Sequence, residues 1–124
     1  MDNAKLMAFV STRDPEKAKA FYFEILGLEF KSEDPFAIVF DSNDVMLRIS
    51  IVKDLNPQPF TVLGWDVPDI RVRIRDLASK GVNFERYSFI PQDADGIWTT
   101  EDGTQVAWFK DPDGNLLSLT QFPN

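Results

Sequence analysis

The alternation of apolar and polar residues near the start of the chain predicts a strand followed by a helix. Residues 6–11 form the predicted strand. Asp14 suits the cap of the helix and Pro15 its first position, while Gly27 favours the left-handed residue that ends it. Between these signals, apolar side chains recur at helical spacing: Ala18, Phe21, Tyr22 and Ile25.

Three β-rich runs follow the helix, at residues 28–31, 36–40 and 45–52. The last two flank the polar segment 41–44, which is typical of a turn. The first half of the chain therefore predicts the order strand, helix and three strands.

The same order of elements recurs in the second half. Residues 60–67 predict a strand, Asp69 a helix cap, Gly81 the end of that helix and residues 82–84 a further extended run. The cap, the closing glycine and the extended run lie 54 or 55 positions after their counterparts. A shared order at a shared spacing indicates an internal duplication.

The second helix has the more ambiguous pattern, because residues 71–75 alternate as a strand would. Ile70, Ile74 and Leu77 nevertheless form a helical stripe, and we favour the helix. Three basic residues of this segment are expected to form a solvated face rather than an anion site: Arg71, Arg73 and Arg75.

The end of the chain predicts a β-hairpin, with apolar runs at 106–110 and 116–121. In the turn between them, Pro112 fixes φ and Gly114 permits positive φ. Before the hairpin, residues 90–103 predict a long loop with a short strand.

Residues 54–59 form a linker with two prolines that is too short to separate independent domains. We therefore expect one domain, 1–124, built from a module at about 4–53 and a second module at about 59–122.

Composition narrows the classes of function. The chain has 124 residues, a net charge of −7 and neither His nor Cys. Nucleic acids and anionic membranes need a concentrated positive surface, so neither is an expected partner. Thiol nucleophiles, disulfides and imidazole-based triads are excluded. No segment has the features of a signal peptide or membrane span, and we expect a cytoplasmic protein.

Five short motifs occur in order over most of the chain. They are Asp14-Pro15-Glu16-Lys17-Ala18, Leu26-Gly27-Leu28, Val67-Pro68-Asp69-Ile70, Lys80-Gly81-Val82 and Phe109-Lys110-Asp111-Pro112-Asp113-Gly114-Asn115. Together they resemble the vicinal oxygen chelate superfamily, the group of glyoxalases, bleomycin-resistance proteins and extradiol dioxygenases. The resemblance implies an α+β fold of two βαβββ modules whose mixed sheet forms an open cup, and it implies a homodimer.

The resemblance also implies positions for metal ligands, because the family's enzymes hold a divalent metal in the cup. Those positions fall on Met7, Val62 and Ser118, with the fourth at Arg48 or, in an alternative register, at Ser50. Thioether, alkyl, hydroxyl and guanidinium groups do not form a site for such a metal. We therefore expect no metal and no cofactor in the cup.

The alternation of strand side chains then predicts which residues face a ligand and which pack under the helices. The expected lining of the cup is Met7, Phe9, Met46, Arg48, Ser50, Val62, Gly64, Ser118 and Thr120. The expected helix side is Leu6, Ala8, Val10, Leu47, Ile49, Ile51, Leu63, Trp65, Leu117 and Leu119.

Two features of the cup have two interpretations each. Arg48 recognises a carboxylate or phosphate, or it pairs with an acid of its own chain or extends to solvent. Trp98 and Trp108 form an aromatic wall for a flat ligand, or they make core or dimer contacts. Phe36 and Phe40 are expected in the core.

Two functions remain open. The first is a metal-free protein that binds, and thereby sequesters, a drug or metabolite through Met7, Phe9, Arg48, Ser50, Val62, Trp98, Trp108, Ser118 and Thr120. The second is a divergent lyase, isomerase or dioxygenase-type enzyme with a relocated metal or none. No catalytic residue can be assigned in either case.

Overall fold

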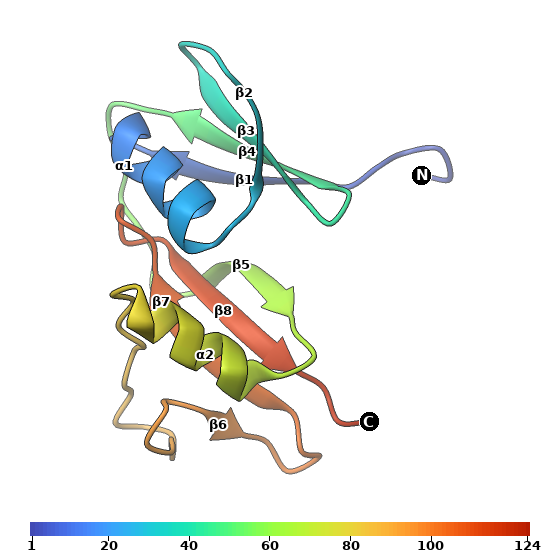
Figure 1. Cartoon of the computed structure of the whole chain (residues 1–124), viewed down its shortest axis with the longest axis vertical. Helices are drawn as coiled ribbons and strands as arrows, with labels where there is room; N and C mark the ends of the chain where they lie inside the picture. Colours follow the sequence, from blue (N-terminus) through green and yellow to red (C-terminus); the bar gives the residue numbers. More distant parts are fainter. The chain divides into compact units, whose positions relative to one another are not determined.

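The computed structural model describes residues 1–124 and contains two four-stranded sheets (Figure 1). The chain divides into two compact units, unit 1 at Met1–Pro57 and unit 2 at Gln58–Asn124. The division lies inside the linker predicted at 54–59.

Unit 1 has the predicted order of elements. They are β1 (Met7–Thr12), α1 (Pro15–Ala20), the π-helical turn η1 (Phe21–Ile25), β2 (Glu29–Glu33), β3 (Ala37–Ser42) and β4 (Val45–Ile51). The sheet order is β1-β4-β3-β2, in which β1 and β4 are parallel and the other pairs are antiparallel.

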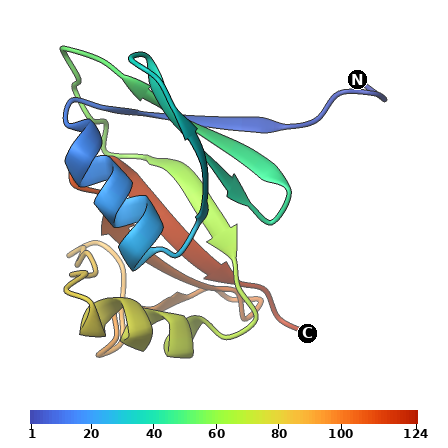
Figure 2. The ribbon, with the colours of Figure 1, turned by 45° about the horizontal axis from the view of Figure 1, so that its top comes forward.

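The first helix begins and ends as the sequence predicts. The Asp14 carboxylate accepts a hydrogen bond from the Lys17 backbone N–H at 3.2 Å, and Pro15 occupies the first turn. At the other end, Gly27 has φ +73°, and the Leu28 N–H donates to the Tyr22 carbonyl at 3.0 Å. Figure 2 shows α1 and η1 as one continuous helical segment.

Aromatic side chains dominate the helix-covered side of unit 1. Phe40 is fully buried, with its ring centroid 6.2 Å from Tyr22 and 5.9 Å from Phe30. The core prediction for Phe40 is confirmed. That for Phe36 is wrong: its side chain is 74% exposed, because it precedes β3 in a turn whose backbone N–H groups bind Asp34.

Unit 2 repeats the architecture of unit 1. Its elements are β5 (Thr61–Asp66), α2 (Ile70–Ser79), β6 (Trp98–Thr99), β7 (Gln105–Lys110) and β8 (Leu116–Gln121). The sheet order β5-β8-β7-β6, with β5 parallel to β8, matches that of unit 1 strand for strand. The two βαβββ modules of the α+β fold are therefore present.

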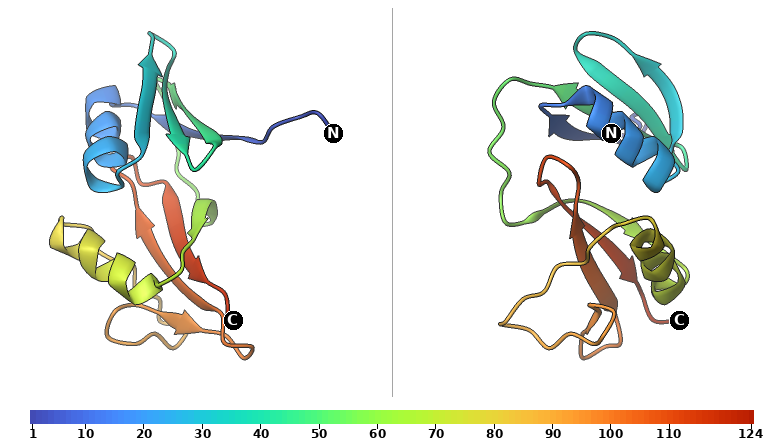
Figure 3. Two further views of the ribbon diagram at one scale, coloured as in Figure 1. Left: turned by 45° about the vertical axis from the view of Figure 1, so that its right-hand side comes forward. Right: turned by 60° about the vertical axis from the view of Figure 1, so that its left-hand side comes forward.

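The second helix is confirmed, with Asp69 as its cap and Ile70, Ile74 and Leu77 buried. The strand predicted at 82–84 is wrong: only Phe84 forms an isolated bridge, to Phe109. The chain instead runs through a long connection before β6 (Figure 3). No helix is long and apolar enough to cross a membrane.

The closing hairpin turns around Asp111. The Asp111 carboxylate accepts hydrogen bonds from the backbone N–H groups of Asp113 and Asn115 and from the Asn115 amide, at 2.8–3.0 Å. Gly114 has φ +91°, as the turn requires.

Burial alternates along β4 as predicted, whereas residues 116–119 of β8 are all buried, so burial does not separate the two faces of that strand. Leu47 and Ile49 of β4 are buried, as are Leu117 and Leu119 of β8, all on the predicted helix side. Leu6 is an exception: it precedes β1, and its side chain is 76% exposed. We call the opposite side of each sheet, away from its own helix, the open face.

Candidate functional site

The open face of the second sheet carries both candidate tryptophans. Trp98 lies opposite Val106 across the β6–β7 pair, and Trp108 lies opposite Ser118 across the β7–β8 pair. Since Val106 also lies opposite Thr120, the four predicted residues of β6, β7 and β8 share this face.

A pocket of about 370 Å³ is lined in part by Trp98 and Trp108 of this face. We call it the aromatic pocket, and its lining is Pro59, Phe60, Thr61, Tyr87, Phe89, Ile90, Trp98, Trp108 and Leu116. These residues come from the end of the linker, from the strands β5 to β8 and from the segment after α2.

The rings of the pocket contact one another. The indoles of Trp98 and Trp108 are stacked at a centroid distance of 6.1 Å and an interplanar angle of 25°. Tyr87 meets Trp108 edge to face at 5.5 Å, and Phe89 lies 5.3 Å from Tyr87. The pocket is thus walled by a continuous aromatic surface.

Hydrogen bonds of the Gln92 side chain hold the segment 85–97, which contributes Tyr87, Phe89 and Ile90 to the pocket. We call this segment the outer wall. Its amide nitrogen donates to the carbonyls of Glu85 and Gly96 at 3.0 and 2.9 Å. Its amide oxygen accepts a hydrogen bond from the Tyr87 backbone N–H at 2.7 Å. One side chain therefore ties the two ends of the segment together.

Two arginines add to this support. The Arg86 guanidinium donates to the carbonyls of Asp93 and Ala94 at 2.5 and 2.6 Å. Arg71 of α2 forms ion pairs with Asp93 at 2.9 Å and Asp95 at 2.5 Å. The Arg71 guanidinium is thus paired with acids of its own chain and is not an open anion site.

Two ionisable groups of this segment have shifted pKa values. Partial burial raises the pKa of Asp93, but the Ile97 backbone N–H, Arg71 and the Asp95 N–H together lower it below its ordinary value. Burial, reinforced by the charge of Glu85, raises the pKa of Tyr87. A tyrosine phenol is already protonated at neutral pH at its ordinary pKa of about 10, so the Tyr87 hydroxyl can donate a hydrogen bond.

Ser118 is buried in the middle of the open face, next to β5. It lies opposite Gly64, and a Cβ atom added to Gly64 would be 2.6 Å from the Ser118 hydroxyl. Glycine at position 64 is what lets β5 approach this hydroxyl. Val62, two residues earlier, lies at an irregularity in the β5–β8 pairing, and its side chain is 43% exposed.

The remaining predicted residues lie together on the open face of the first sheet. Met7 is opposite Met46, and Phe9 is opposite Arg48. Ser50 follows Arg48 on the same side of β4 and pairs with Ser11. The Met7, Phe9 and Met46 side chains are exposed, so this face is apolar around one guanidinium.

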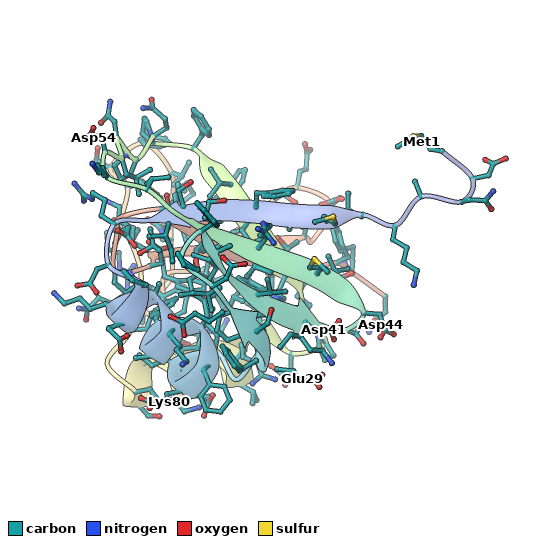
Figure 4. The ribbon with its side chains drawn as sticks, turned by 90° about the horizontal axis from the view of Figure 1, so that it is seen from above. Met1, Glu29, Asp41, Asp44, Asp54 and Lys80 are labelled. Carbon is teal, nitrogen blue, oxygen red and sulfur yellow. The ribbon has the colours of Figure 1, made fainter.

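Arg48 is half-buried, and its charge acts on the Asp34 carboxylate. Hydrogen bonds from the Phe36 and Ala37 N–H groups lower the pKa of Asp34, and the Arg48 charge contributes without an ion pair between the two. Elsewhere in the unit, acids gather near the β3–β4 turn, where Figure 4 labels Glu29, Asp41 and Asp44. The anion-binding role of Arg48 stays a prediction.

The structure thus groups the predicted residues into two sets, one in each unit. Trp98 and Trp108 alone among them line the aromatic pocket. Sequence reasoning missed the pocket residues outside the predicted strands, above all Tyr87, Phe89 and Ile90. Aromatic residues alternating in a loop segment, Tyr87-Ser88-Phe89, were the available signal.

Comparison with known proteins agrees with this architecture. The family model "Glyoxalase/Bleomycin resistance protein/Dioxygenase superfamily" matches residues 6–119. No match was found among curated proteins.

Solved structures extend the comparison at low identity. A bleomycin resistance determinant encoded on the transposon Tn5 has a TM-score of 0.76 at 24% identity, covering 98% of this chain and 100% of that one. An antibiotic binding protein from a Streptomyces species has a TM-score of 0.72 at 23% identity, with 98% and 97% covered. Lactoylglutathione lyase from Agrobacterium tumefaciens has a TM-score of 0.74 at 18% identity, with 96% and 93% covered. The chain belongs to the glyoxalase/bleomycin resistance protein/dioxygenase superfamily.

Proposed function

We propose that this chain is a metal-free binding protein that sequesters a small aromatic molecule in the aromatic pocket. The observation that carries the proposal is the pocket itself, of about 370 Å³, with the stacked indoles of Trp98 and Trp108 in its wall. Small-molecule sites are concave and mostly apolar, with a few polar groups that fix orientation. This lining has that composition.

The donor chemistry supports the metal-free part of the proposal. The family positions carry Met7, Val62, Arg48 and Ser118, none of which offers an imidazole, carboxylate or thiolate. No group of three or more His, Cys, Asp or Glu side chains is arranged to hold a metal ion. The residues present therefore do not fit the family's metal, and no step of the proposal uses one.

Two of the similar structures are consistent with sequestration, since one is a bleomycin resistance determinant and the other an antibiotic binding protein. The proposal includes the further expectations from the family resemblance: one domain over residues 1–124, a homodimer, and a cytoplasmic location. A divergent lyase, isomerase or dioxygenase-type enzyme stays the alternative.

Titration of the full chain with naphthalene, followed by tryptophan fluorescence, tests the pocket. We expect saturable binding that weakens about fivefold in Trp98→Ala, because stacking on an indole contributes about 1 kcal/mol beyond area burial. Phe36→Ala is the matched control, since Phe36 is an exposed aromatic residue outside the pocket. Equal affinity in all three proteins would contradict the proposed site.

Metal analysis of the same preparation tests the metal-free part of the proposal. We expect no stoichiometric divalent metal and no change of affinity on addition of a chelator. A stoichiometric transition metal whose removal abolishes binding would favour the enzyme alternative.

A further inference from the structure

The polar atoms of the aromatic pocket restrict which molecules fit it, and the inference drawn from them rests on the proposed function. Among the lining side chains, only those of Thr61, Tyr87, Trp98 and Trp108 carry a polar atom. The two indole N–H groups donate and never accept. The side chains of the lining include no carboxylate, amide or imidazole and no ammonium or guanidinium group.

The ring donors have no partner inside the protein. Tyr87 enters hydrogen bonding through its backbone N–H, not through its phenol, and the indoles of Trp98 and Trp108 form ring contacts only. No buried side-chain nitrogen or oxygen atom in the chain lacks a hydrogen-bond partner. It follows that these three half-buried residues keep their polar atoms accessible to solvent.

A ligand that covers these solvent-accessible donors displaces water from them. A buried donor left without an acceptor costs about 1–3 kcal/mol, so a pure hydrocarbon gains stacking but loses hydrogen bonds. A ligand with acceptors at the edge of its ring system keeps both.

The distribution of charged side chains around the pocket favours an uncharged ligand. No charged side chain lines the pocket. The neighbouring acid, Glu85, is paired with Lys110 at 3.5 Å, so its charge is compensated locally. A cationic or anionic ligand would be desolvated here without a counter-charge in the lining.

We propose that the ligand of the aromatic pocket is an uncharged, planar aromatic molecule with carbonyl-type acceptors at its edge, a quinone or aryl ketone. The stacked indoles bind its face, and Tyr87 donates a hydrogen bond to an acceptor.

Three probes with the same bicyclic ring separate the chemical classes by calorimetry on the full chain. They are 1,4-naphthoquinone with neutral acceptors, naphthalene without polar atoms and 1-naphthylmethylammonium with a positive charge. We expect the quinone to bind about tenfold tighter than naphthalene, and the cation to bind weakest. The chain has no cysteine thiol that could add to the quinone.

Tyr87→Phe removes one donor and keeps the ring. We expect about a fivefold loss of affinity for the quinone and none for naphthalene. Ser88→Ala is the control, because it deletes an exposed hydroxyl from the same segment outside the pocket.

The outcomes distinguish this inference from the proposed function. Equal binding of quinone and naphthalene, tightest binding of the cation, or an unchanged quinone affinity in Tyr87→Phe overturns the ligand class and leaves the binding site standing. Absence of binding by all three probes overturns both.

Discussion

The two units share one topology, but the aromatic clusters described above lie on the helix side of the sheet in unit 1 and on the open face in unit 2. In unit 1, Tyr22, Phe30 and Phe40 form a cluster beneath the helix. In unit 2, Trp98 and Trp108 lie on the open face and wall a pocket. The same βαβββ order therefore supports a core in one unit and a candidate binding surface in the other.

The units differ most in the connection that follows the helix. In unit 1, Gly27 leads almost directly into β2. In unit 2, the segment 85–97 intervenes before the short strand β6, and it contributes Tyr87 and Phe89 to the pocket. Part of the pocket lining of unit 2 therefore lies in a connection that has no counterpart of similar length in unit 1.

The largest expected effect is on the free energy of unfolding, which should fall more when a core ring is removed than when a pocket ring is removed. Phe40→Ala removes a fully buried ring and should lower the free energy of unfolding by about 3–5 kcal/mol. Trp98→Ala removes a half-buried ring and should cost about 1–2 kcal/mol, because part of its surface is already in contact with water. Urea denaturation of both variants measures the difference, and equal losses would contradict the division of roles.

A second contrast uses equivalent positions in the two sheets. Phe9 on β1 and Gly64 on β5 lie 55 residues apart, each on the open face of its own sheet. Gly64→Ala should destabilise by about 1–3 kcal/mol, since the added Cβ would overlap the Ser118 hydroxyl. Phe9→Ala should cost less, because its side chain is 55% exposed.

The double variant Gly64→Ala/Ser118→Ala provides the control for this contrast. Removing the hydroxyl leaves the nearest remaining atom, the Ser118 carbonyl oxygen, at 3.4 Å from the added Cβ. Thermal unfolding of the double variant should recover most of the lost stability. If it does not, the contact with the hydroxyl is not the cause of the loss.

Local signals predicted the framework of the fold. Asp14, Asp69 and Asp111 each satisfy nearby backbone N–H groups through a short polar side chain, and such signals depend on a few consecutive residues. Together with strand alternation they identified the modules and the open faces.

The outer wall of the pocket could not be predicted in the same way. Its conformation depends on Gln92 reaching Glu85 and Gly96 and on Arg71 of α2 reaching Asp93, contacts that no periodicity encodes. The prediction that Phe36 lies in the core was wrong for a related reason. Hydrophobicity does not reveal that the Asp34 turn keeps its ring outside the sheet.

The smallest expected effect is an acid-sensitive loosening of that outer wall. The pKa of Asp93 is lowered in the folded protein, so this carboxylate stabilises the fold at a pH above its unfolded value of about 3.9. The contribution is lost as the pH falls through the lower, folded pKa. The protection of residues 85–97 against hydrogen exchange, relative to the intrinsic exchange rate at each pH, should therefore decrease below about pH 4, before that of β7 and β8.

Asp93→Asn sharpens this last comparison because it removes the titrating group while retaining an oxygen for the Asp95 and Ile97 N–H groups. The variant should exchange faster than the parent at pH 7 and show a flatter acid response in this segment. Unit 1 provides the internal reference, since the Asp34 turn has its own lowered pKa and keeps its acid response in the variant. Uniform acceleration across both units would mean that acid unfolds the chain globally, and the outer wall would then not be a separately held element.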